Sequence, residues 1–260
     1  MFKRNKKSSI IVMLAALLML LPLSGTAQSI TRGKKQQTTK TSTSPKKKDV
    51  KSSSKNKTTT KEKSNKSEST KKANTKATVH EYVDLGLSVK WATCNIGANS
   101  PEDVGDYYAW GETSVKYSYV EDNYRWYHDG HYELPGGLSD IAGSDYDVAH
   151  VKWGGKWRLP TLYEIKELTD NCTSTFTTIN GISGRLITGP NGKSIFIPAG
   201  GWIGDLETPS FTGLLCMIRS SQKSVTEEKW AWYIFSSPEK LSISYDIPRY
   251  YGLNVRPVCK

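Results

Sequence analysis

The hydrophobic and polar positions divide this chain of 260 residues into three zones. An uninterrupted apolar run extends from Ile10 to Leu21, directly after a cluster of positive charges. A long zone of Lys, Ser, Thr and Asn follows, with almost no large apolar residue. From His80 onward, short apolar and aromatic segments alternate with glycine-rich turns. The pattern therefore predicts three parts, and only the last can bury a core: 1–28, 29–79 and 80–260.

Within the last zone, short segments rich in β-branched and aromatic residues lie between turn signals, and we expect them to be strands. They are Ser88–Thr93, Arg185–Thr188, Ser194–Pro198, Trp230–Phe235 and Asn254–Val258. The stretch LITGPNGKSIFIPA predicts a hairpin that turns at Pro190-Asn191-Gly192, because this tripeptide separates two apolar runs.

One helix is predicted from its capping residues and its apolar spacing. Thr161 is suited to the N-cap, and Glu164 follows three residues later, which is the spacing of a capping box. The apolar residues after the cap recur on one helical face. They are Leu162, Ile165 and Leu168. We expect this helix to end near Asn171.

A second, shorter helix is predicted over residues 147–152, with Asp145 or Asp147 as its N-cap. Few helices, many short strands and long loops indicate an α+β fold. At about 180 residues, the zone is one ordinary domain, long enough to bury about 70% of its unfolded surface.

The first zone has the organisation of an export signal. The run Ile10–Leu21 has the length of a signal core and falls short of the roughly 20 residues that span a bilayer. Gly25-Thr26-Ala27 then offers the small residues at which such signals are cleaved. We therefore expect an extracytoplasmic protein, with no transmembrane span after cleavage; an uncleaved anchor is the alternative.

The positive charge of the chain is concentrated in its first 79 residues. Of 36 basic and 25 acidic residues, 20 basic and 3 acidic lie there, so the remaining 181 residues hold 16 and 22 and carry a net charge of −6. The basic zone predicts a disordered tether, or adhesion to an anionic polymer or lipid head groups through Lys46-Lys47-Lys48. It contains no aromatic residue to stack on bases, and export argues against a specific nucleic-acid partner.

Five segments, in order, are similar to a known family of exported bacterial domains. They are EYVDLGLSVKWATCNIGA, GDYYAWGET, DVAHVKWGGKWRLPTLYEIKEL, SIFIPAGG and YGLNVRPVC. Together they resemble the Fibrobacter-type major paralogous domain over nearly all of residues 82–259. The resemblance implies a fold like those of C-type lectins and the sulfatase-modifying, formylglycine-generating enzyme. That family has no general assigned activity, so the resemblance implies little about function.

Enzyme chemistry is not favoured by the candidate residues. The formylglycine-generating enzyme uses a close pair of cysteines near its C-terminus, whereas Cys216 and Cys259 lie 43 positions apart. We therefore expect no catalysis and no cofactor. His128 and His131, in the segment HDGH, are weak candidates for a zinc or copper site with Asp122 or Glu133. The preferred interpretation of HDGH is an exposed polar loop tip.

A variable-looking aromatic loop contains the candidate ligand-binding residues. Aromatic faces beside short acids are suited to sugar or peptide recognition, because the ring supplies apolar area and the polar groups fix orientation. The candidates are Asp122, Tyr124, Trp126, Tyr127 and Asp129. The alternative is that Tyr124, Trp126 and Tyr127 only pack the core. The calcium-dependent sugar motifs of C-type lectins do not occur in the sequence.

Four cysteines allow three pairings in an exported protein. The resemblance implies that the first and last strands lie together, so Cys94–Cys259 is the preferred disulfide. Cys172 and Cys216 either pair or stay buried, and the apolar neighbours of Cys216 favour a core position.

The first functional hypothesis is a non-catalytic recognition module for glycan or protein at the cell surface. The second is a structural or assembly protein of the cell envelope. The third is a redox or metal enzyme on the same fold.

Overall fold

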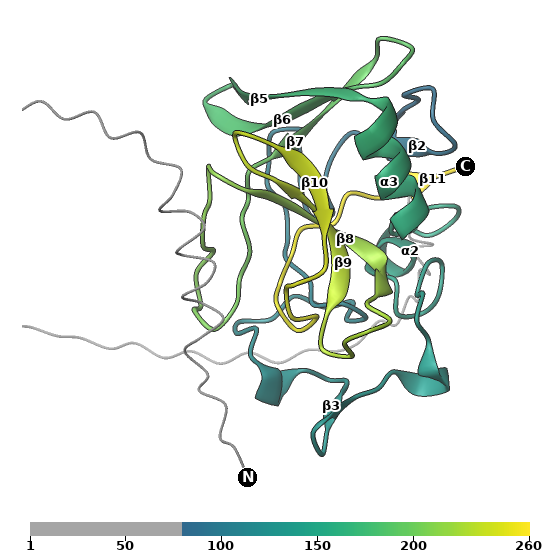
Figure 1. The fold of residues 1–260 in the computed structure, drawn as a ribbon, viewed down its shortest axis with the longest axis vertical. Coiled ribbons are helices and arrows are strands. Elements are labelled where there is room, and N and C mark those ends of the chain that lie inside the picture. Colours follow the sequence, from purple (N-terminus) through teal and green to yellow (C-terminus); the bar gives the residue numbers. More distant parts are fainter. Residues whose placement is uncertain (1–79) are drawn as a thin grey trace, which may run out of the picture. The chain divides into compact units, whose positions relative to one another are not determined.

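A computed structural model describes residues 80–260 of this chain, shown in Figure 1. The predicted signal peptide, 1–28, and the predicted linker, 29–79, lie outside the described residues. Small antiparallel sheets with two α-helices make up the described part, which confirms the α+β class. Within it, neither helix is long and apolar enough to cross a membrane.

The beginning and the end of the described part meet in one small sheet. Its order is β1-β2-β11, and its strands are β1 (Tyr82–Val83), β2 (Lys90–Ala92) and β11 (Val258–Cys259). All pairs are antiparallel. The expectation that the first and last strands lie together is therefore confirmed.

The predicted disulfide Cys94–Cys259 is wrong, and the register of this sheet gives the reason. Cys259 lies opposite Lys90, which is four residues before Cys94. β2 ends at Ala92, so Cys94 lies beyond the paired strands, whereas Cys259 lies within them. All four cysteines are free thiols, and Cys216 is buried, with its thiol directed to the carbonyl oxygen of Ile197 at 3.2 Å.

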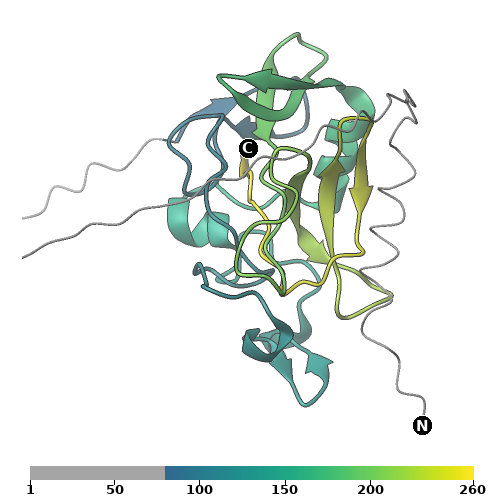
Figure 2. The same ribbon diagram turned by 90° about the vertical axis from the view of Figure 1, so that its left-hand side faces the viewer.

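A second sheet is a three-stranded meander, visible in both ribbon views (Figure 1, Figure 2). Its strands are β5 (Thr173–Ile179), β6 (Ile182–Thr188) and β7 (Ser194–Pro198). Asn180 and Gly181 connect the first two with φ of 50° and 82°, as a tight hairpin requires. The predicted hairpin at Pro190-Asn191-Gly192 is confirmed as the β6–β7 connection.

The third sheet has the order β10-β9-β8 and packs against the longer helix. Its strands are β8 (Cys216–Lys223), β9 (Ala231–Ser236) and β10 (Leu241–Ser244). A separate hairpin consists of β3 (Tyr127–His128) and β4 (His131–Tyr132). Two short 3₁₀ turns flank this hairpin, η1 (Glu121–Asn123) and η2 (Pro135–Gly137).

The strand predictions succeed except near the C-terminus. Ser194–Pro198 matches β7 at both ends, and the segments predicted around residues 90, 187 and 232 overlap β2, β6 and β9. The predicted strand Asn254–Val258 is wrong for most of its length, because only Val258 enters β11. Pro257 has no N–H to donate to a ladder, and Asn254 forms an isolated bridge with Ile218 of β8 instead.

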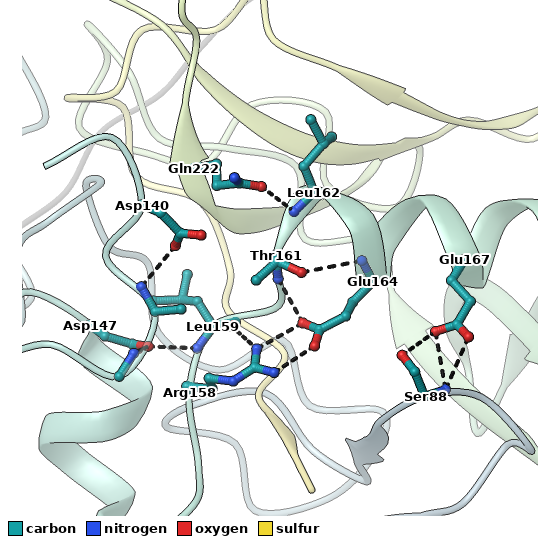
Figure 3. Close-up of polar contacts among 12 residues, drawn as sticks. Ser88, Asp140, Asp147, Arg158, Leu159, Thr161, Leu162, Glu164, Glu167 and Gln222 are labelled. Carbon is teal, nitrogen blue, oxygen red and sulfur yellow. Dashed lines mark hydrogen bonds and ion pairs between the residues drawn. The ribbon is translucent and has the colours of Figure 1, made fainter.

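Both helices begin where the sequence predicts. In α3 (Leu162–Asn171), the Thr161 hydroxyl accepts the Glu164 N–H while the Glu164 carboxylate accepts the Thr161 N–H (Figure 3). In α2 (Val148–Trp153), Asp147 is the N-cap, so the alternative cap Asp145 is excluded. The apolar face of α3 lies in the core, as expected from its spacing.

The core beneath the long loops is filled largely by aromatic side chains. Trp110 is 1% exposed, and its ring lies 5.1 Å from the guanidinium of the buried Arg249. Tyr124 and Tyr132 approach the same guanidinium at 5.8 and 5.3 Å. The three aromatic rings stabilise the buried Arg249 cation. They thereby connect loop segments that have little regular structure.

Candidate functional site

A pocket of about 390 Å³ opens between three loop segments. The segments are the chain after Trp110, the η1–β3 region and the residues before α2. The lining residues are Gly111, Glu112, Thr113, Ser114, Lys116, Asn123, Arg125, Trp126, Asp145 and Tyr146. Its volume lies within the range of about 300–1,000 Å³ in which small-molecule sites are usually found.

Glu112 joins the first wall of the pocket to the second. Its carboxylate accepts the backbone N–H of Arg125 at 2.8 Å and forms an ion pair with Lys116 at 2.9 Å. The Lys116 ammonium also donates to the backbone and side-chain oxygens of Asn123, each at 3.1 Å. The amide of Asn123 in turn donates to the carbonyl of Ser118 at 2.8 Å. Bonds among Glu112, Lys116, Asn123 and the backbone of Arg125 therefore fix the shape of this part of the pocket.

Trp126 contacts the first and the third segments of the pocket lining. Its indole N–H donates to the carbonyl of Gly111 at 2.9 Å, and its ring meets Tyr146 edge-on at 5.2 Å. The guanidinium of Arg125 lies 4.8 Å from the indole ring. Trp126 is 8% exposed, so little of its side chain is open to a ligand.

Asp147 positions the third wall, although it does not itself line the pocket. Its buried carboxylate accepts the Leu159 N–H at 2.8 Å (Figure 3). It also accepts the Gly143 N–H at 2.9 Å, besides those it caps on α2. Burial raises the pKa of Asp147, and the four backbone N–H donors oppose that rise. The carboxylate thus fixes the chain on which Asp145 and Tyr146 face the pocket.

Two charged groups in the lining are not used by this framework. Arg125 and Asp145 are both exposed. Within residues 80–260 neither side chain takes part in a hydrogen bond or ion pair, although the Arg125 guanidinium lies beside Trp126. The hydroxyls of Thr113 and Ser114 add uncharged donors and acceptors to the same lining. The pocket therefore offers one cation, one anion and several hydroxyls to a ligand.

The aromatic loop that the sequence singled out is mainly packing. Tyr124 is 2% exposed, and its hydroxyl donates to the carbonyl of Trp110 at 2.6 Å. Trp126 is buried as described, and Tyr127 is half-buried against Tyr132, with ring centroids 4.9 Å apart. The expectation that Tyr124 and Trp126 bind a ligand through open ring faces is therefore corrected: both pack in the core. This part of the chain has little regular structure, and large aromatic side chains fill its interior.

The two acids proposed for the same loop remain on the surface. Asp122 lies exposed in η1, outside the pocket lining, and Asp129 is exposed at the tip of the β3–β4 hairpin. His128 and His131 flank that tip as opposite residues of the two strands. Within residues 80–260, no group of three or more metal-ligating side chains gathers, so neither Asp122 nor Glu133 joins the histidines.

Sequence reasoning identified Trp126 but missed the polar residues that line the pocket beside it. Glu112 and Lys116 lie in a segment without a recognisable ligand-binding motif, and the sequence indicates Asp145 only as a candidate helix cap. The spacing between these positions carries no periodic signal, since three loops bring them together. Comparisons with family models, curated proteins and solved structures found no match for this chain.

Proposed function

We propose that residues 80–260 form a non-catalytic recognition domain that binds a short saccharide in the pocket beside Trp126. The observation that carries this proposal is that some polar side chains of the lining bond to each other, while two charged side chains do not. Glu112, Lys116 and Asn123 bond to one another, whereas the side chains of Arg125 and Asp145 have no hydrogen-bond or ion-pair partner within the described residues.

Saccharide hydroxyls fit this pair of free groups. A hydroxyl both donates and accepts hydrogen bonds, so neighbouring hydroxyls satisfy a carboxylate and a guanidinium at the same time. The planar guanidinium of Arg125 presents paired donors, and the carboxylate of Asp145 presents paired acceptors. Trp126 and Tyr146, which both line the pocket, supply apolar contact for a sugar ring.

A binding role is favoured over glycoside hydrolysis by the state of the two carboxylates. Hydrolysis of a glycosidic bond ordinarily needs two carboxyl groups that face the substrate. Glu112 is 8% exposed, is paired with Lys116 and accepts the Arg125 N–H, so Asp145 is the carboxylate left to meet a ligand.

The setting we propose for this domain follows from the sequence. The five segments that resemble the Fibrobacter-type major paralogous domain favour a C-type-lectin-like fold, and the α+β class is compatible with it. The apolar run near the N-terminus favours an extracytoplasmic location. The basic stretch before His80 would then tether the domain near an anionic surface.

A glycan array probed with the full chain tests this function and selects a ligand for calorimetry. Asp145→Asn keeps the size of the side chain and removes the free anion, so we expect at least tenfold weaker binding. Arg125→Gln removes the free cation, and a similar loss is expected. Both side chains are exposed, so neither change should alter the fold.

Asp122→Asn is the matched control, because Asp122 is an exposed acid on the neighbouring η1 turn outside the lining. Its affinity should equal that of the parent chain. An array without any bound saccharide would overturn the proposal, as would a bound saccharide whose affinity is the same in Asp145→Asn and Arg125→Gln.

A further inference from the structure

The β3–β4 hairpin carries two histidines at its tip, and it projects away from the three larger sheets in both ribbon views (Figure 1, Figure 2). Asp129 and Gly130 form the two-residue turn, with φ of 49° and 87°. Positive φ at both positions is the geometry of the tight turn that matches the twist of a hairpin. His128 and His131 are consequently opposite each other in register.

Opposite residues in an antiparallel pair point to the same side of the ribbon. Their Cβ atoms lie about 4.5–5.5 Å apart. Both imidazoles are exposed, and within residues 80–260 neither takes part in a hydrogen bond or ring contact. An imidazole nitrogen binds zinc at about 2.0–2.1 Å, so two rings with this separation can reach one ion between them.

We propose that His128 and His131 form a two-imidazole site for a divalent transition-metal ion. Cu²⁺ is expected to bind most tightly. Zn²⁺ and Ni²⁺ bind more weakly, because among divalent first-row metal ions the affinity for nitrogen ligands is highest for Cu²⁺. Since no third metal-ligating residue gathers there among the described residues, water completes the coordination. The site is separate from the pocket, whose lining includes neither histidine.

The identity of the ligands predicts a metal selectivity that an acidic surface would not have. Ca²⁺ and Mn²⁺ prefer oxygen ligands and gain little from imidazole. The domain carries a net negative charge, so carboxylates elsewhere would attract these ions weakly and without the same order. Binding at the histidine pair should therefore be strong for Cu²⁺ and undetectable for Ca²⁺ at the same concentration.

Calorimetric titration of the full chain with Cu²⁺, Zn²⁺, Ni²⁺, Mn²⁺ and Ca²⁺ tests the site. His128→Gln and His131→Gln should each weaken Cu²⁺ binding at the hairpin at least tenfold, and the double variant should lose this binding step. His150→Gln is the matched control, because His150 lies in α2, and it should bind as the parent chain does. Circular dichroism should be unchanged in the hairpin variants, since both hairpin histidines are exposed.

Electron paramagnetic resonance of the chain with one equivalent of Cu²⁺ gives an independent measurement. Two imidazole nitrogens should couple to the copper in the parent chain, and one in each single variant. The proposal is overturned if the double variant binds Cu²⁺ as tightly as the parent chain. It is also overturned if the parent spectrum shows a single imidazole, or if Ca²⁺ binds as tightly as Cu²⁺.

Discussion

At the residue scale, single buried side chains connect segments that are far apart in the sequence. The wholly buried guanidinium of Arg256 donates to Asn95 Oδ1 at 2.7 Å and to the carbonyl oxygens of Ala92 and Phe196 at 3.1 and 2.9 Å. It also donates to the carbonyl of Thr93. Burying a cation is costly unless its donors are satisfied, and these oxygens satisfy them. The C-terminal segment is thereby fixed to β2 and β7.

The ion pair of Arg158 and Glu164 makes stability depend on acid pH. The carboxylate accepts two guanidinium hydrogen bonds, at 2.7 and 2.5 Å (Figure 3). Burial by itself raises the pKa of Glu164. The hydrogen bonds from Arg158 and Thr161 lower it by more, so the pKa lies below its usual value. The ionised form therefore adds stability above the unfolded pKa of about 4.3, and this is lost as the pH falls through the folded pKa.

Glu164→Gln should accordingly lower the free energy of unfolding by about 2 kcal/mol at pH 7, measured by urea denaturation. The difference between the two chains should shrink as the pH falls below 4. Asp170→Asn breaks the exposed pair with Lys166 on the same helix and should cost less than about 0.5 kcal/mol. Equal losses in both variants at pH 7 would contradict this assignment.

Gly201 occupies a position that only glycine can fill. Its φ is +64°, and a Cβ there would overlap the carbonyl oxygen of Ser210, which pairs with Trp202 across the loop. Gly201→Ala should destabilise the fold by about 3–4 kcal/mol, since backbone strain and steric overlap add. Gly213→Ala has a similar φ of +81° but open space around it, so it should cost only about 1–2 kcal/mol. Thermal unfolding of the two variants separates overlap from strain.

At the element scale, short helices and strands are fixed by their ends. The helix α2 has six residues, too few to be stable alone, and Asp147 supplies its N-terminal hydrogen bonds. The β3–β4 hairpin has two residues in each strand and is set by the Asp129-Gly130 turn. Local residues therefore decide where such elements begin, while packing decides whether they persist.

Asp147→Ala should destabilise the domain by about 3 kcal/mol, because four backbone N–H groups lose their acceptor in a buried setting. Asp145→Ala, two residues earlier and exposed, should change the free energy of unfolding by less than about 0.5 kcal/mol. Chemical denaturation measures both. Comparable losses would mean that Asp145 also supports α2, contrary to the observed cap.

At the scale of the whole molecule, the described part is closed by strand pairing between its ends. β11 pairs with β2, and the Arg158 N–H donates to the Val258 carbonyl from the other side. Long-range contacts of this kind restrict the chain without covalent links, and the four cysteines remain unpaired.

We therefore expect four free thiols per chain when the protein is unfolded in denaturant without reductant and treated with a thiol reagent. Prior reduction should leave that number unchanged. In the folded protein, Cys216 should react slowest, because it is buried and burial raises its pKa to about 11. A count of two or zero thiols would show that disulfides form.

The sequence alone was enough to place the elements that local chemistry defines. The capping box of Thr161 and Glu164 predicted α3, and the Pro190-Asn191-Gly192 turn predicted the β6–β7 hairpin. These signals succeed because the interacting groups lie within a few residues of each other. Strand ends near Pro257 were missed, because pairing there depends on distant partners.

Only the tertiary structure showed the strand register, the unpaired state of the cysteines and the grouping of the pocket residues. Residues 94 and 259 lie in adjoining segments, but only the tertiary structure shows that Cys259 lies opposite Lys90 and that both thiols are free. Tyr124 is buried and packs in the core. Three loops bring Glu112, Arg125 and Asp145 around one pocket. Such groupings depend on contacts between residues far apart in the chain, and no periodic signal in the sequence indicates them.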